Sequence, residues 1–187
     1  MKAKNLGACV VAAVTLFVAS PSTAACIVTK SAIPEKDAAR PGVLGLSLED
    51  LIHGMKARKR ETSPDDAGGS FTAVTFTHSM SIIAEGDETN LSRFSISMGW
   101  SPDKDDTQKA AATAMFIVAR AFGARTQEDI QRASEWFVTV LDAMTQQFVS
   151  TGRNGVVSEY DKDRFHITVA GMRVPDAVLL CFEPRGN

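Results

Sequence analysis

The chain has 187 residues and a formal net charge of −2, with 44% hydrophobic and 7% aromatic residues. This length and composition fit one globular domain, and they exclude a collagen-like, coiled-coil or wholly disordered chain. A charge near zero argues against a nucleic-acid-binding protein, which usually carries a clear basic excess. No apolar run reaches the roughly 18–20 residues of a membrane-spanning helix.

The N-terminus has the pattern of a secretory signal peptide. A positively charged start precedes an apolar run over residues 6–19, and small residues follow it. This pattern predicts residues 1–25 as a signal peptide, cleaved after Ala24 or Ala25; a buried N-terminal helix or strand is the alternative. The alanine-rich run is typical of bacteria, so we expect residues 26–187 to form one domain that is periplasmic or secreted.

Signal cleavage leaves two cysteines, Cys26 at the new start of the chain and Cys181 near its end. In an oxidising compartment two cysteines predict one disulfide. By loop entropy it would stabilise the fold by about 3–5 kcal/mol, less any strain. Lipidation of Cys26 is the alternative, because residues 23–26 loosely match a bacterial lipobox without its usual leucine.

The mature chain begins with an irregular stretch. Residues 27–45 contain prolines and glycines and show no sustained period, which predicts an extended arm or strand followed by a loop. Ser47 followed by Asp50 is a helix-start pattern. The apolar residues after it recur at helical spacing, so we expect a helix over 47–59. A polar loop is expected over 61–70.

A β-hairpin is predicted next. Apolar and polar residues alternate over 74–82 and, after turn residues at 85–90, again over 93–100. This period-2 pattern on both sides of a turn predicts two strands with one buried face. His78 shares the register of the apolar positions, so we expect a core histidine with a hydrogen-bond partner, or else a functional base or pH-sensitive group.

Two helices and three strands complete the chain. Ser101 and the proline after it predict the start of a helix whose body covers 108–122. Thr126, with an aspartate three residues later, starts an amphipathic helix that ends at Gly152. Further strands are predicted over 156–160, 165–169 and 177–182.

These elements predict an α+β fold in which helices pack on an antiparallel sheet, in the order α-β-β-α-α-β-β-β. Residues 93–99 resemble residues 164–171, and each stretch follows an acidic turn. This echo indicates two α-β-β halves, the second with an extra helix. The alternative is that any amphipathic hairpin strand gives such a pattern.

No catalytic motif is evident. The sequence lacks Gly-x-Ser-x-Gly and Cys-x-x-Cys, and its histidines do not stand at metal-ligand spacing. Carboxylate pairs fall in turns or at a helix start, where solvation or the helix dipole accounts for them. We therefore predict no catalytic residue, no metal and no cofactor.

Two surface features are candidates for binding. The polar face of the predicted sheet offers a flat surface suited to another protein, although a solvated face is the alternative. Its candidate binding residues are Arg93, Ser95, Ser97, His166 and Thr168. A basic cluster of Lys56, Arg58, Lys59 and Arg60 could meet an anionic lipid or an acidic partner, or could simply complement the end of a helix.

This pattern favours an exported, non-catalytic binding protein of the bacterial envelope with a protein partner, acting as an inhibitor, an immunity-like factor or an assembly accessory. One alternative is a small periplasmic hydrolase with His78 or His166 as general base beside a carboxylate. Another is a small-molecule carrier between the sheet and the helix pair. A deep apolar cavity containing His78 would favour the enzyme or the carrier, whereas a packed core would favour the binding protein.

Overall fold

The computed structural model describes residues 43–64, 69–173 and 176–186. The predicted signal peptide, its cleavage site, the greater part of the N-terminal arm and Cys26 lie outside these residues. The predicted disulfide therefore stays a prediction.

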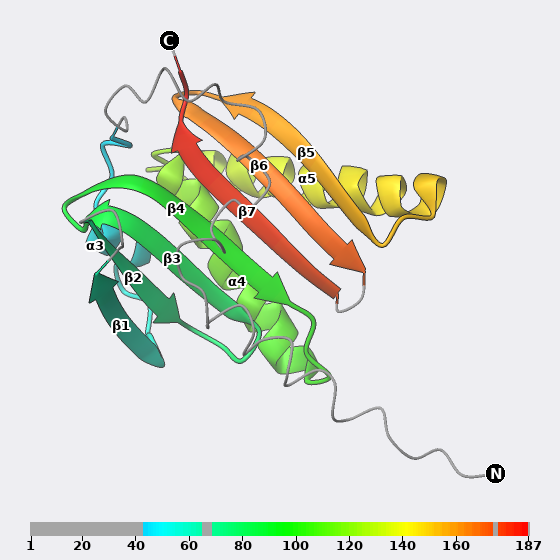
Figure 1. Ribbon diagram of the computed structural model, residues 1–187, viewed down its shortest axis with the longest axis horizontal. Coiled ribbons are helices and arrows are strands. Elements are labelled where there is room, and N and C mark those ends of the chain that lie inside the picture. The colour runs from blue at the N-terminus through cyan, green and yellow to red at the C-terminus, as the bar shows by residue number, and fades with distance from the viewer. Residues whose placement is uncertain (1–42, 65–68, 174–175, 187) are drawn as a thin grey trace.

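One antiparallel sheet of seven strands is the framework of the fold (Figure 1). Its strand order is β1-β2-β3-β4-β7-β6-β5. The strands are β1 (Lys59–Pro64), β2 (Ser70–Thr75), β3 (Met80–Asp87), β4 (Asn90–Gly99), β5 (Gly155–Lys162), β6 (Phe165–Arg173) and β7 (Asp176–Pro184). Together with the helices, this sheet confirms the predicted α+β class.

The helices are α3 (Leu48–Ile52), α4 (Lys104–Ala121) and α5 (Gln127–Thr151). In Figure 1, α4 and α5 lie behind the sheet and diverge from the turn that joins them. As predicted, α5 begins with a capping box at Thr126 and ends at Gly152, which takes the left-handed conformation. The cap of α4 is Asp103 rather than Ser101, and its side chain accepts the Asp105 N–H.

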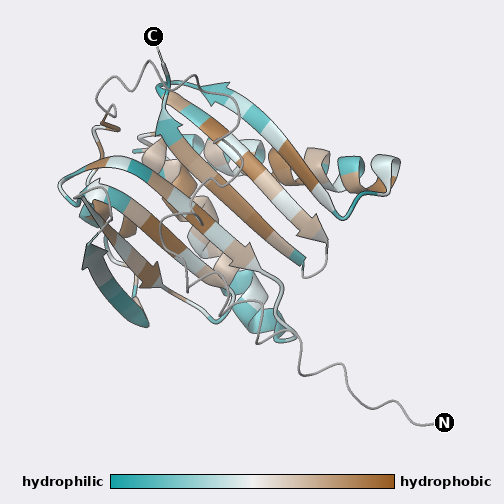
Figure 2. Cartoon of the chain, in the orientation of Figure 1, coloured by the Kyte–Doolittle hydropathy of each residue, from teal (hydrophilic) through white to brown (hydrophobic). Residues whose placement is uncertain are grey.

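The hydrophobic core lies between the sheet and these helices. Phe94 of β4 and Phe182 of β7 stack with their ring centroids 4.4 Å apart. Phe165 of β6 meets the Phe182 ring edge-on, and Phe122 closes the group from the end of α4. Figure 2 shows the contrast between the central strand β7, mostly hydrophobic, and the edge strand β1, hydrophilic throughout.

The predicted hairpin is wrong in its first strand. The chain leaves β2, turns through residues 76–79 and returns as β3. His78 is exposed on this turn and does not lie on the apolar face. The turn is held by Asp106 of α4, whose carboxylate accepts the His78 N–H at 3.0 Å and the Ser79 hydroxyl at 2.6 Å. Alternation in the sequence carries no sign of this tertiary contact.

The first predicted helix is too long, and a strand follows it. Helix α3 ends at Ile52, and Gly54 has a φ of +71°, a left-handed conformation that stops a helix. The chain then forms β1, where the sequence predicted the end of the helix and a polar loop. A short polar strand is a common form of sheet edge, because charged side chains discourage pairing with other molecules.

In the described part of the chain, four strands, rather than two, therefore precede α4. The observed order is α-β-β-β-β-α-α-β-β-β, so the chain does not consist of two α-β-β halves. The two similar stretches lie in β4 and β6, which flank β7 on either side. Each of them pairs with β7 in antiparallel register, which accounts for their similar pattern.

Candidate binding surfaces

The sheet face opposite α4 and α5, here called the second face, carries the polar residues predicted to bind a partner. It faces the viewer in Figure 1. By strand register, its members include Thr75, Ser81, Glu85, Arg93, Ser95, Ser97, Cys181, Glu183, His166, Thr168 and Asp161. The prediction that Arg93, Ser95, Ser97, His166 and Thr168 share one face is therefore correct in its geometry.

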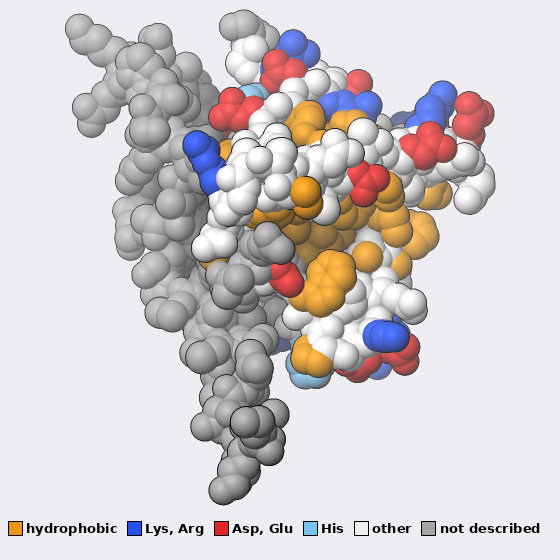
Figure 3. Space-filling model, turned by 90° about the vertical axis from the view of Figure 1, so that its right-hand side faces the viewer, with side chains coloured by type: hydrophobic (Ala, Val, Ile, Leu, Met, Phe, Trp, Pro, Cys, Tyr) orange, Lys and Arg blue, Asp and Glu red, His pale blue; other side chains and the backbone are white. Residues whose placement is uncertain are grey.

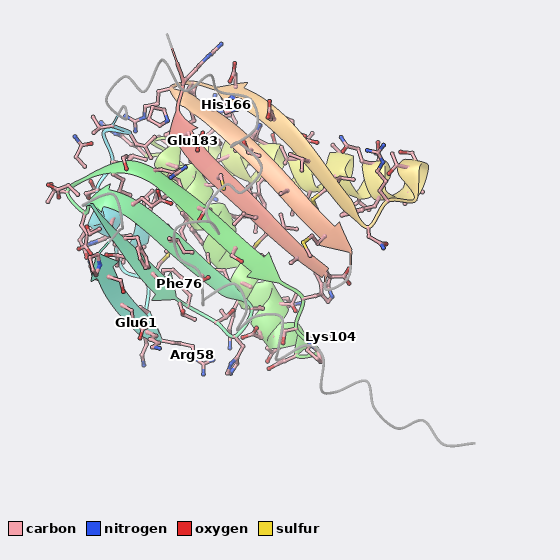
Figure 4. The ribbon with its side chains drawn as sticks, viewed as in Figure 1. Arg58, Glu61, Phe76, Lys104, His166 and Glu183 are labelled. Carbon is pink, nitrogen blue, oxygen red and sulfur yellow. The ribbon has the colours of Figure 1, made fainter. Side chains whose placement is uncertain are left out.

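An ionic row crosses one end of the second face, over five neighbouring strands from β3 to β5. Arg93 Nη2 lies 2.5 Å from Glu85 Oε2, and Arg93 Nη1 lies 3.0 Å from Glu183 Oε1. His166 stands opposite Glu183, and its Nδ1 lies 2.9 Å from Asp161 Oδ1. Figure 4 shows His166 and Glu183 near the same end of the sheet. Opposite charges in neighbouring positions of this kind stabilise a sheet.

The pair of His166 and Asp161 is the feature closest to a general base. The hydrogen bond to His166 holds the pKa of Asp161 below its usual range, and the nearby charge of Arg185 acts in the same direction. The neighbours of His166 across the strands are Glu183 and Asp161. The next side chain of β6 on this face, Thr168, is two residues away along the strand, which is about 7 Å. The described residues therefore bring no nucleophile to this histidine.

The centre of the second face is built from small side chains. Ser95, Cys181 and Thr168 form a line across β4, β7 and β6, and they are 1%, 1% and 4% exposed. The Ser95 hydroxyl oxygen is buried and has no hydrogen-bond partner within the described part of the chain. Two of the five predicted binding residues are thus buried, while Arg93, Ser97 and His166 are half-buried.

A second candidate surface is an apolar hollow on the helix side of the sheet. Figure 3 shows hydrophobic side chains gathered in a recess between the sheet and the diverging helices. Phe148 of α5 packs near Gly171 of β6, which stands beside Val178 of β7. Val178, Phe148, Leu141 and Met115 are only partly buried against the core.

Trp100 directly follows β4, and its backbone contacts the start of β7, two residues before Val178. The alternation in the sequence placed Trp100 on the buried face, but it is 71% exposed. The strand ends one residue earlier, at Gly99, and the Trp100 N–H donates to the Asp176 carbonyl oxygen at the start of β7. The carboxylates of Asp176, Asp103 and Asp105 are exposed on this part of the surface.

A shallow pocket of about 330 Å³ lies at the opposite end of α4. It is lined by residues of two turns, among them Phe122, Asp163, Arg164 and Phe165. The ammonium group of Lys162 lies 5.1 Å from the centre of the Phe122 ring, and the Arg164 guanidinium lies 5.2 Å from that of Phe165. The first of these contacts fastens the β5–β6 turn to the end of α4.

The basic cluster is spread over a loop and β1 rather than over the end of a helix. Arg60 is paired with Glu49 and Glu88, at 2.6 Å in both cases. These contacts tie β1 to α3 and to the β3–β4 turn. Lys56 and Arg58 are exposed. A contact of this cluster with an anionic surface stays a prediction.

No group of three or more His, Cys, Asp or Glu side chains that could hold a metal ion occurs among the described residues. No helix in that part of the chain is long and apolar enough to cross a membrane. Comparisons with known protein families, with curated proteins and with solved structures give no match for this chain.

Proposed function

We propose that the mature chain is an exported, non-catalytic binding protein that holds an apolar segment of a partner protein in the hollow between α4, α5 and the sheet. The observation that carries this proposal is the exposure of Trp100, at 71%, where its backbone meets the start of β7, the strand that carries the partly buried Val178. Apolar side chains grouped on one surface are typical of interaction sites. Tryptophan is among the residues most enriched at the centres of binding interfaces.

An open hollow fits a protein segment better than a small carried molecule. Carrier pockets enclose most of the surface of their ligand. The Trp100 side chain, by contrast, lies largely in solvent. Met115 and Met144 lie on the two helices that flank the recess, and methionine side chains adapt readily to the shape of a partner. The exposed Asp103, Asp105 and Asp176 favour a segment with basic residues beside its apolar ones.

The predicted signal peptide supports an encounter in the periplasm or outside the cell. Inhibition, immunity and assembly assistance are all roles in which a small exported domain acts by binding alone. A hydrolase centred on His166 is the second candidate, because a carboxylate lies 2.9 Å from its ring. We rank it second because no nucleophile lies beside this pair among the described residues.

Site-specific crosslinking tests the proposal. A photoreactive amino acid, p-benzoylphenylalanine, replaces Trp100 in the exported protein, and cells of the native host are irradiated. The proposal predicts one prominent crosslinked protein. The matched control carries the same amino acid at Val43, which is 58% exposed. Val43 precedes Leu44, whose N–H donates to the Leu91 carbonyl oxygen at the start of β4. The length of β4 separates Leu91 from Trp100, so Val43 lies about 30 Å from Trp100.

The control site should give no such crosslink. Equal crosslinking from both positions, or none from Trp100, would contradict the proposed surface. Crosslinking from Trp100 to lipid alone would indicate a membrane contact in place of a protein partner.

A further inference from the structure

We propose that the outer edge of β5 is a self-association surface, at which two copies of the chain pair their β5 strands antiparallel and join their sheets into one. The two-fold axis of this dimer passes beside Val157. The inference concerns an edge of the sheet and not the hollow between α4 and α5, so it does not rest on the proposed function.

The two edges of the sheet are built differently (Figure 1). At one edge, β1 is six residues long, begins with three charged residues and ends in Pro64, which has no N–H to donate. Short length, charge and proline are devices that protect a sheet edge from pairing with other molecules. At the other edge, β5 is eight residues long and contains no proline, and within the described part of the chain it pairs with β6 alone. The outer edge of β5 therefore presents a regular row of backbone donors and acceptors.

Contacts with α5 hold β5 in an extended form before any second copy arrives. Gln147 Nε2 of α5 donates to the Ser158 hydroxyl oxygen at 2.9 Å. The rings of Trp136 and Tyr160 meet edge-on, with their centroids 6.1 Å apart. The strand also pairs with β6 in an uninterrupted register from Gly155 to Lys162. Because β5 is already ordered, pairing with a second copy costs little conformational entropy.

An apolar row on the second face leads to this edge. Val157 is 44% exposed and stands opposite Ala170 of β6, and Met172, 40% exposed, stands opposite Gly155. Pairing about Val157 would place the two Val157 side chains against each other and continue the row from one sheet into the next. Valine side chains form favourable cross-strand pairs of this kind.

Charge selects the register of the pairing. With the axis at Val157, residues 155–159 pair with the same residues of the second copy in reverse order, and Arg153 lies opposite Asp161. Shifts of the axis toward the end of β5 would place Glu159 opposite Val157, then opposite itself, then opposite Asp161. A carboxylate offers valine no apolar contact, and acids directly opposite each other destabilise a sheet. The arrangement about Val157 avoids all three.

Analytical ultracentrifugation of the mature protein tests the inference. Wild type should form a concentration-dependent dimer at or below about 100 μM. Val157→Lys should raise the dissociation constant of the dimer by about tenfold or more, because it replaces the apolar contact with two like charges at the axis. Val138→Lys, at a valine of α5 that is 48% exposed, is the matched control and should dimerise like wild type. A monomeric wild type, or equal dimerisation of the two variants, would overturn the proposal.

Engineered cysteines test the register, in protein whose native thiols are removed by Cys26→Ser and Cys181→Ser. Residues directly opposite in an antiparallel pair have their Cα atoms about 4.5–5.5 Å apart, within the range of a disulfide. Val157→Cys should therefore link two chains when oxidised glutathione accepts the two protons and two electrons of the thiols.

Glu159→Cys is the matched control for the register. In the proposed dimer the two copies of residue 159 are separated by roughly 13 Å along the strands, too far for a disulfide, and the chains should stay unlinked. Linkage through residue 159, or none through residue 157, would contradict pairing about Val157.

Discussion

At the scale of single residues, Asp106 connects parts of the fold that are distant in sequence. Its carboxylate, at the start of α4, accepts two hydrogen bonds from the β2–β3 turn. Burial raises the pKa of Asp106, but the hydrogen bonds from Ser79 and the His78 N–H outweigh it, so the pKa lies below its ordinary value. The ionised form therefore stabilises the folded protein.

Asp106→Ala should lower the free energy of unfolding by about 2–3 kcal/mol at neutral pH, because hydrogen bonds to a charged acceptor are lost and their donors stay partly buried. Denaturant unfolding measures this change. Asp105→Ala is the matched control, since Asp105 is exposed in the same helical turn, and it should change stability much less. Equal losses in the two variants would contradict the role given to Asp106.

The effect of Asp106→Ala should depend on pH. A carboxyl group whose pKa is lowered in the folded state stabilises it above the unfolded-state pKa, near 4, and loses that contribution as pH falls through the folded-state value. The difference between wild type and variant should therefore shrink below about pH 4. A difference that stays constant down to pH 2 would show that lost packing, and not the charge, is responsible.

Residue-level errors of the sequence analysis have one physical source. Alternation assigned His78 and Trp100 to the buried face, but both lie outside the strands, where the period of two no longer determines which way a side chain points. What ends the first strand is the turn held by Asp106, 28 positions further along the chain. The composition of the second face, by contrast, follows from alternation within strands, and Arg93, Ser95 and Ser97 were placed correctly.

At the scale of elements, the packing of α5 on β6 depends on Gly171. A Cβ atom at this position would overlap Met144 Sδ and lie 3.1 Å from Phe148 Cζ. Gly171→Ala should therefore push α5 away from the sheet and lower stability by about 1–3 kcal/mol. In the matched control, Gly155→Ala, the nearest atom would be 3.8 Å away, so thermal unfolding should shift little. Equal shifts in the two variants would show that the close approach at Gly171 does not control the packing of α5 on the sheet.

The start of α5 is fixed by local sequence. The Thr126 hydroxyl accepts the Asp129 N–H, and the Asp129 carboxylate accepts the Thr126 N–H. The hydrogen bond from Arg132, followed by those from the Arg125 and Thr126 groups, holds the pKa of Asp129 well below its usual range.

Thr126→Ala should cost about 1 kcal/mol of unfolding free energy, as expected for the loss of an N-cap. Thr139→Ala is the control, because the Thr139 hydroxyl bonds only to the Glu135 carbonyl oxygen within the exposed helix. If both variants unfold at the same denaturant concentration, the cap contributes nothing.

Elements with local signals were predictable, and those that depend on distant partners were not. Helix α5 carries its cap, its stripe and its stop within its own sequence. Strand β1 has a polar sequence without alternation, and it is a strand because β2 and the contacts of Arg60 hold it at the sheet edge. The early end of α3 depends on the left-handed conformation of Gly54. The local sequence does not determine that conformation.

At the scale of the whole molecule, the two sides of the sheet differ. The second face carries the ionic row that includes Arg93, Glu183 and His166. The hollow on the helix side is proposed to receive a partner. That assignment does not follow from composition or motifs, because it depends on how α4 and α5 cover the sheet.

The measurement that tests the central claim most directly is affinity capture from the envelope fraction of the native host, comparing wild type with two matched variants. Wild type and Val43→Ser should retain the same partner protein in stoichiometric amount. Trp100→Ser should lose most of it without loss of thermal stability. Equal retention by Trp100→Ser, or no partner with the wild type, would contradict binding through the hollow.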